Sequence, residues 1–158
     1  MPRSPVQIRL STPEETCRFA ERLGARLRPG DTLLLSGPIG AGKSHFARCL
    51  IQSLQDIPEE VPSPTFTIVQ SYEMPAGEIW HADLYRLSDP QELAELGLDE
   101  AFETAICLVE WPERLGSAQP ASALRLGFGP GALPDARVLV LAWESPGWDT
   151  RLEGLCGD

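Results

Sequence analysis

Lysine and asparagine are almost missing from this chain of 158 residues. It has one lysine, Lys43, and no asparagine, and every other basic residue is arginine. Regulatory GTPases commonly read guanine with an N/T-K-x-D motif, and the chain has no asparagine and no second lysine to supply one. A guanine-specific switch is therefore disfavoured, and ATP is the expected nucleotide.

The cysteines show no spacing typical of a zinc or redox site. Cys17, Cys49, Cys107 and Cys156 lie 32, 58 and 49 residues apart, so the sequence contains no C-x-x-C pair. We predict that they are reduced thiols and that most are buried.

The chain also has no excess of basic residues and no long apolar segment. The net charge is −10, from 13 basic and 23 acidic residues, and this opposes tight binding to a phosphate backbone by the chain alone. No apolar run approaches the length of a membrane span, and the first residues have no apolar signal core. The sequence predicts a cytoplasmic protein without membrane contact that reaches nucleic acid only through a partner.

The length and composition fit one compact domain. A chain of this length with 42% hydrophobic residues can fill a substantial core. No linker, internal repeat or low-complexity tract divides it, so we expect a single domain over residues 1–158.

The single lysine lies in a glycine-rich segment. Residues 37–44 read G-P-I-G-A-G-K-S and match the phosphate-loop pattern G-x-x-x-x-G-K-[ST] at every fixed position. In an arginine-rich chain, a lone lysine here indicates a place where a compact ammonium must reach between phosphates. The apolar run at 32–35 and the helical spacing of 44–54 supply the strand and the helix that flank such a loop.

The loop pattern predicts individual roles. Lys43 is expected to contact the β- and γ-phosphates, and the Ser44 hydroxyl is expected to bind Mg²⁺. The alternative, a glycine-rich turn that binds nothing, is disfavoured by the two flanking elements. The expected phosphate-binding residues are Ile39, Gly40, Ala41, Gly42, Lys43 and Ser44.

Strand and helix patterns alternate along the chain. A helix is predicted from the Ser11–Glu15 start to about Leu27, with further helices at 44–54 and 90–98. The hairpin 65–72/78–85, turning at 75–77, and the pair 124–128/138–143 predict antiparallel strands. The expected fold is α/β, a central mixed β-sheet flanked by helices and containing antiparallel strands. The remaining predicted strands are 6–10, 32–35 and 106–109.

Two acids near strand ends are candidates to complete the phosphate site. Glu110 follows the apolar strand 106–109, where a metal-binding carboxylate is placed at the edge of a sheet, and Asp83 lies near the end of strand 78–85. The segment 63–67 offers hydroxyls where nucleotide switches sense a γ-phosphate. Each has a plain alternative, a solvated acid or a simple strand entry.

Four segments together make the pattern specific. In this order and at these separations, the chain resembles the TsaE (YjeE) family, the ATPase of bacterial tRNA threonylcarbamoyladenosine synthesis. The likeness spans roughly residues 6–143. The segments are SGPIGAGKS, SPTFTIVQSYE, HADLYRL and CLVEWPER.

The resemblance implies a P-loop NTPase-like α/β fold and assigns residues by motif. By this resemblance, Ser44 and Glu110 correspond to the Mg²⁺ ligands of the family. The catalytic residues correspond to Lys43, Thr65 and Asp83. Adenine contacts are implied near 11–13 and 134–137, so Pro13 and Pro134 join the expected nucleotide-binding residues, which also include Asp83.

The chain departs from the family pattern at a few positions. Pro38 replaces an acid, Ser44 replaces the commoner threonine, Pro62 replaces a polar residue before S-P-T, and Ala82 replaces an aromatic residue. Ser44 keeps the hydroxyl, so the chemistry is expected to be intact.

The resemblance also implies a function. The chain would bind and hydrolyse ATP and couple its turnover to TsaB-like and TsaD-like partners, which form the threonylcarbamoyl group on adenosine 37 of tRNAs reading ANN codons. Contact with tRNA would be indirect, through the complex. The alternative is a small-molecule kinase, which is disfavoured because no segment combines several arginines with a lid-like insertion.

Four further residues have open roles at this point. Arg86 either counters phosphate charge or pairs with an acid such as Asp89. His45 either touches nucleotide or, as favoured, lies partly exposed at the surface. His81 should share the sheet face of Asp83, and it either orients that acid or packs. Trp111 either shields the site from water or packs.

Overall fold

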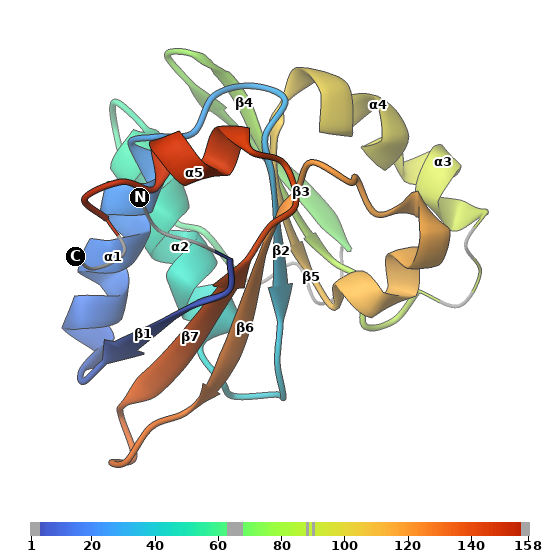
Figure 1. The fold of residues 1–158 in the computed structure, drawn as a ribbon. Coiled ribbons are helices and arrows are strands. Elements are labelled where there is room, and N and C mark those ends of the chain that lie inside the picture. Colours follow the sequence, from blue (N-terminus) through green and yellow to red (C-terminus); the bar gives the residue numbers. More distant parts are fainter. Residues whose placement is uncertain (1–3, 63–67, 88, 90, 156–158) are drawn as a thin grey trace.

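The computed structural model describes residues 4–62, 68–87, 89 and 91–155. These residues form a seven-stranded sheet with helices on both faces (Figure 1). The strand order is β1-β7-β6-β2-β5-β4-β3. The strands are β1 (Val6–Leu10), β2 (Thr32–Ser36), β3 (Val69–Met74), β4 (Gly77–Asp83), β5 (Ile106–Glu110), β6 (Leu124–Pro130) and β7 (Arg137–Ala142).

The sheet is mixed, as predicted. Strand β2 lies at its centre and runs parallel to β5 and β6, and β4 runs parallel to β5. The pairs β1–β7, β6–β7 and β3–β4 are antiparallel, which confirms both predicted antiparallel pairs. Strand β3 begins later than predicted, at Val69; Thr65, in the early part of the predicted strand, lies outside the described residues.

The helices differ from the prediction mainly at their ends. Helix α1 starts as predicted, because the Thr12 side chain accepts a hydrogen bond from the Glu15 amide at 3.1 Å and Pro13 occupies the first turn. It ends at Gly24 rather than near Leu27. The helices are α1 (Pro13–Gly24), α2 (Lys43–Leu54), α3 (Glu92–Leu96), α4 (Leu98–Thr104) and α5 (Gly147–Arg151), with a 3₁₀ helix, η1, at Pro112–Ala118.

One predicted helix is two. The segment expected as a single helix at 90–98 is broken by Gly97, whose φ of +81° ends α3 and allows α4 to start in a new direction. Helix α5 and η1 were not predicted, because such short elements carry too few residues to show a period. In the described part of the chain, no helix has the length and apolar content needed to cross a membrane.

Each face of the sheet has its own apolar core. Side chains of alternate residues point to opposite faces, so Leu33 and Leu108 pack with α1 and α2, whereas Leu34 and Val109 pack with α4 and η1. Figure 1 shows α1 and α2 on one side of the sheet and α3 and α4 on the other. His81, Asp83 and Glu110 follow the same alternation as Leu108 and therefore face α2, the helix that follows the glycine-rich loop.

The prediction that the cysteines are reduced was wrong for one pair. A disulfide joins Cys17 of α1 to Cys49 of α2, with the Cα atoms 5.3 Å apart. The two helices pack side by side, an arrangement that the spacing of the cysteines in the sequence does not reveal. Cys107 is a free thiol, and burial in β5 raises its pKa to about 12. Cys156 lies outside the described residues.

Candidate functional site

The glycine-rich loop connects β2 to α2. Gly37, Gly40 and Gly42 have φ angles of +140°, +82° and +101°, which residues with a side chain rarely adopt. At Gly37 a Cβ would also lie 2.6 Å from the carbonyl oxygen of Phe128. The glycines at these positions are therefore required by the backbone, and the loop delivers Lys43 and Ser44 into the first turn of α2.

Arg137 ties the loop to β7. Its Nε donates to the Ala41 carbonyl at 2.9 Å and one Nη to the Gly40 carbonyl at 3.3 Å. The other Nη donates to the carbonyls of Pro134 and Ala136, both at 2.8 Å. One guanidinium thus holds the glycine-rich loop and the segment before β7 together.

Lys43 is buried against the loop and an aromatic ring. The residue is only 5% exposed. Its Nζ donates a hydrogen bond to the Gly37 carbonyl oxygen at 2.5 Å and lies 3.8 Å from the centre of the Trp111 ring. Burial lowers the pKa of Lys43, while the charges of Glu110, Glu113 and Asp83 oppose that shift.

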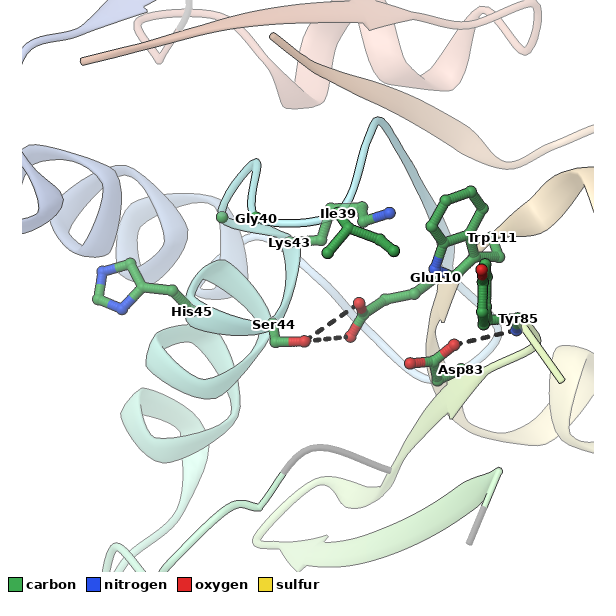
Figure 2. Close-up of a pocket in the computed structure, with 10 residues that line it drawn as sticks. Ile39, Gly40, Lys43, Ser44, His45, Asp83, Tyr85, Glu110 and Trp111 are labelled. Carbon is green, nitrogen blue, oxygen red and sulfur yellow. Dashed lines mark hydrogen bonds between the residues drawn. The ribbon is translucent and has the colours of Figure 1, made fainter. Parts of the chain in front are cut away.

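Two acids meet at the edge of the parallel strands. Asp83, the last residue of β4, lies directly opposite Glu110, the last residue of β5. The Ser44 hydroxyl lies 3.1 and 3.0 Å from the two carboxylate oxygens of Glu110 (Figure 2). Asp83 accepts a hydrogen bond from the Tyr85 amide at 3.0 Å. The structure therefore brings Lys43, Ser44, Asp83 and Glu110 together from three separate segments.

The two histidines have different surroundings. His81 is 1% exposed, and its Nε2 lies 2.7 Å from a carboxylate oxygen of Glu110. The contact thus goes to Glu110; orienting Asp83 and packing were the two roles that the sequence left open for this histidine. His45 is half-buried at the start of α2, with its Nε2 3.1 Å from the Pro13 carbonyl oxygen, and Figure 2 shows its ring pointing away from the acids.

Trp111 turns sharply out of β5. Its φ of +58° and ψ of +53° place it in the left-handed region, which a bulky residue occupies only at a cost in free energy. The turn sets its ring against Tyr85, with ring centres 4.8 Å apart, and over Lys43. Tyr85 was not predicted as a site residue, although it belongs to the same H-A-D-L-Y-R-L segment as Asp83.

These residues line one cavity of about 450 Å³, a size suited to a small ligand. Its walls contain most of the predicted phosphate and metal residues. Ala41 instead lines a smaller adjoining pocket with Arg137, and Thr65 lies outside the described residues. The lining residues are Ile39, Gly40, Gly42, Lys43, Ser44, His45, Asp83, Tyr85, Glu110 and Trp111.

A second cavity of about 450 Å³ lies beyond the loop. It is lined by residues 9–11 and by much of 130–138, including Arg137. The smaller pocket shares Ile39 and Gly40 with the first cavity and Pro130 and Arg137 with the second. Pro13 and Pro134 do not line either large cavity. Each is hydrogen-bonded through its carbonyl oxygen to a residue that lines one of them, Pro13 to His45 and Pro134 to Arg137.

Comparison with known proteins identifies the family. The family model described as threonylcarbamoyl adenosine biosynthesis protein TsaE matches residues 10–132. The chain belongs to the TsaE family. A TsaE of Rickettsia bellii is 38% identical over 77% of this chain and 85% of its own, and a TsaE of Bacillus subtilis is 40% identical over 77% and 75%.

A solved structure of the Bacillus subtilis protein YdiB is also similar. It superimposes with a TM-score of 0.79 at 29% identity and covers 98% of this chain and 96% of its own. The fold expected from the sequence is thereby confirmed. The segment matched by the TsaE model contains Lys43, Ser44, Asp83 and Glu110 but ends before Pro134 and Arg137.

The oxygen atoms of this TsaE-family site suit a hard cation. Mg²⁺ prefers oxygen ligands and is usually held by one or two protein groups together with water and substrate phosphates. The Ser44 hydroxyl and the Glu110 carboxylate converge within 3.1 Å beside the buried ammonium of Lys43. These residues therefore fit a magnesium ion that binds together with a phosphate ligand.

Proposed function

We propose that the chain is a Mg²⁺-dependent ATPase that serves tRNA threonylcarbamoyladenosine formation. The observation that carries the proposal is the convergence of the Ser44 hydroxyl and the Glu110 carboxylate in one cavity with Lys43 and Asp83. These groups are the parts that phosphoryl transfer needs, since catalysis there depends mainly on positioned charge.

The phosphate side of the site is supplied by the glycine-rich loop. Residues 39–44 surround the phosphates with amides, and the start of α2 adds the partial positive charge of a helix N-terminus. The Lys43 ammonium, which lies on the Gly37 carbonyl in the free protein, exchanges that partner for phosphate oxygens. The Trp111 ring covers Lys43, and it would therefore also restrict the access of water to the phosphates.

The metal and the attacking water belong to the acidic side. Ser44 and Glu110 are the residues that would hold Mg²⁺, which neutralises charge on the transferred phosphoryl group when it is bound. Asp83, which lies opposite Glu110 on the neighbouring strand, is proposed to orient the attacking water. Thr65 is proposed as a γ-phosphate contact by its motif alone.

The base of the nucleotide is proposed to lie toward the second cavity. The adjoining pocket at Ile39, Gly40 and Arg137 links the two cavities, so a nucleotide with its phosphates on the loop can extend toward residues 9–11 and 130–138. Pro13 and Pro134 flank this path and remain the proposed adenine neighbours.

The proposed cellular role follows from the family. ATP turnover would be coupled to TsaB-like and TsaD-like proteins that form the threonylcarbamoyl group on adenosine 37 of tRNAs reading ANN codons. The net charge of −10 supports contact with tRNA through these partners rather than directly. Such a role is cytoplasmic.

Nucleotide binding and ATP hydrolysis by single variants test this proposal. Lys43→Ala is expected to lose ATP binding, Glu110→Ala to lose the gain in affinity that Mg²⁺ provides, and Asp83→Ala to bind ATP but hydrolyse it slowly. Glu78→Ala is the matched control, because Glu78 is an exposed acid at the opposite end of the strand that carries Asp83.

Several results would overturn the proposal. ATP hydrolysis at the wild-type rate by a folded Lys43→Ala protein would remove the phosphate site. Identical behaviour of Asp83→Ala and Glu110→Ala would show that their roles are wrongly divided. Failure of TsaB-like and TsaD-like proteins to bind or stimulate the ATPase, together with phosphorylation of an added metabolite, would favour a small-molecule kinase.

A further inference from the structure

His81 is a buried polar residue that the proposed ATPase mechanism has not used. It lies in β4 two residues before Asp83, is 1% exposed, and places its Nε2 2.7 Å from Glu110 Oε2. Glu110 itself is 2% exposed. A short, fully buried contact therefore joins an imidazole to the carboxylate that is proposed to bind Mg²⁺.

We propose that His81 is a positioning residue that fixes the Glu110 carboxylate for metal binding. This inference rests on the proposed function, because it concerns the metal ligand of the same site. Groups that hydrogen-bond to metal ligands set the ligands' orientation and strongly affect metal affinity.

The donor and acceptor assignments support this role. A carboxylate can only accept hydrogen bonds, so the 2.7 Å contact requires the proton on Nε2, which donates to Oε2. Among the described residues, no group is hydrogen-bonded to His81 Nδ1. The contact with Glu110 is therefore the polar interaction that the structure shows for this ring.

A packing role alone does not account for a histidine here. Burying two ring nitrogens costs free energy that an apolar ring of similar size would avoid. One of the nitrogens recovers this cost by bonding Glu110, and the other does not, within the described residues. The side chain is explained by what it does to the carboxylate.

The geometry leaves one carboxylate oxygen for the ion. His81 holds Oε2, while the Ser44 hydroxyl lies 3.0 Å from Oε2 and 3.1 Å from Oε1. The imidazole thus holds Oε2, and Oε1, which has no contact with His81, remains 3.1 Å from the Ser44 hydroxyl. Parallel pairing of β4 with β5 keeps the two side chains on the same face of the sheet.

The test separates metal binding from nucleotide binding. ADP affinity is measured by calorimetry with and without Mg²⁺ for the wild type and for His81→Phe, which keeps the ring volume and removes the donor. His81→Gln keeps a donor, and His81→Met is a second variant without one. Thr32→Val is the matched control, because Thr32 is also a buried polar residue, 2% exposed, at the other end of β2 from the loop. Mn²⁺ binding followed by electron paramagnetic resonance provides a direct metal readout.

We expect both donor-free variants to bind ADP normally without metal and to bind Mn²⁺ and Mg²⁺–ADP at least about tenfold more weakly. His81→Gln should recover most of the metal affinity, and Thr32→Val should behave as the wild type. Metal affinity equal to that of the wild type in a folded donor-free variant would overturn the role of His81 alone. If Mg²⁺ does not tighten ADP binding to the wild type, the metal site of the proposed function fails, and the role of His81 fails with it.

Discussion

Replacing Arg137 with alanine should weaken nucleotide binding without removing any residue that lines the cavity of the phosphate loop. The guanidinium holds the carbonyls of Gly40 and Ala41. Because a trans peptide is planar, its N–H points opposite to its C=O. Fixing the Ala41 carbonyl on Arg137 therefore directs the Gly42 amide away from Arg137, and Gly42 lines the cavity.

The size of the effect follows from the contacts. A hydrogen bond from a charged donor contributes about 1.5–3 kcal/mol net. Arg137 donates to four carbonyl oxygens, and only that of Ala41 belongs to a buried residue, 7% exposed. Water can replace the guanidinium at the other three carbonyls more easily, so the bond to Ala41 accounts for most of the loss. If the roughly 1.5–3 kcal/mol of free energy that holds the loop in its binding conformation is lost, the ATP affinity should fall about 10- to 150-fold.

The assay is isothermal titration calorimetry, which measures the affinities of the Arg137→Ala and Arg137→Lys variants for ATP and ADP. Lysine keeps the charge but has no planar fork with which to reach two segments at once, so it should restore little of the affinity. Arg125→Ala is the control, since it removes an arginine from the neighbouring strand whose exposed contact with Glu144 is 3.5 Å long and contributes only about 0–1 kcal/mol. Wild-type affinity in Arg137→Ala, or full recovery in Arg137→Lys, would refute the reasoning.

Two other predictions concern the disulfide and the lysine. The Cys17–Cys49 disulfide closes a loop with a sequence separation of 32, which corresponds to about 3–4 kcal/mol of stabilisation. Reductant should therefore lower the melting temperature of the wild type but not of the Cys17→Ser/Cys49→Ser variant, and equal melting of both proteins in both buffers would contradict the bridge. Because burial lowers the pKa of Lys43 from 10.5, its ammonium loses its proton at a lower pH than an ordinary lysine. Calorimetry across a pH series should then show ATP affinity falling as the pH rises, at pH values below 10.5, while adenosine, which has no phosphate, shows no such fall; a parallel fall for both would contradict the assignment.

The parts of this molecule that follow local rules could be predicted from the sequence. The glycine-rich loop has fixed residues whose conformations and flanking elements are set within a short segment, and Lys43 and Ser44 lie in the first turn of α2 as expected. Strand β5 could be predicted from its apolar run, and the position of Glu110 at the edge of the sheet from its place at the end of that run. The antiparallel hairpin β3–β4 was likewise predictable, because its partners are consecutive in the chain.

What could not be predicted depends on partners distant in the chain. His81 contacts Glu110 because β4 lies beside β5 in parallel register, and no pattern in either strand specifies that neighbour. Cys17 meets Cys49 only because α1 and α2 share a face of the sheet. Arg137 was included in an expected adenine-binding segment, yet its hydrogen bonds to Gly40 and Ala41 arise from the position of β7, far along the chain from the loop.

The central place of β2 has a consequence for synthesis on the ribosome. Its two neighbours in the sheet, β5 and β6, both come much later in the chain and are therefore synthesised later. Strand β1 likewise pairs with β7, near the end of the chain. A nascent chain that has reached residue 104 already contains the whole glycine-rich motif and Asp83, but it has neither of the strands that hold β2 in place. Contacts of such large sequence separation form slowly because long loops must close first. The early-made motif therefore waits for the last third of the protein before it can become a site.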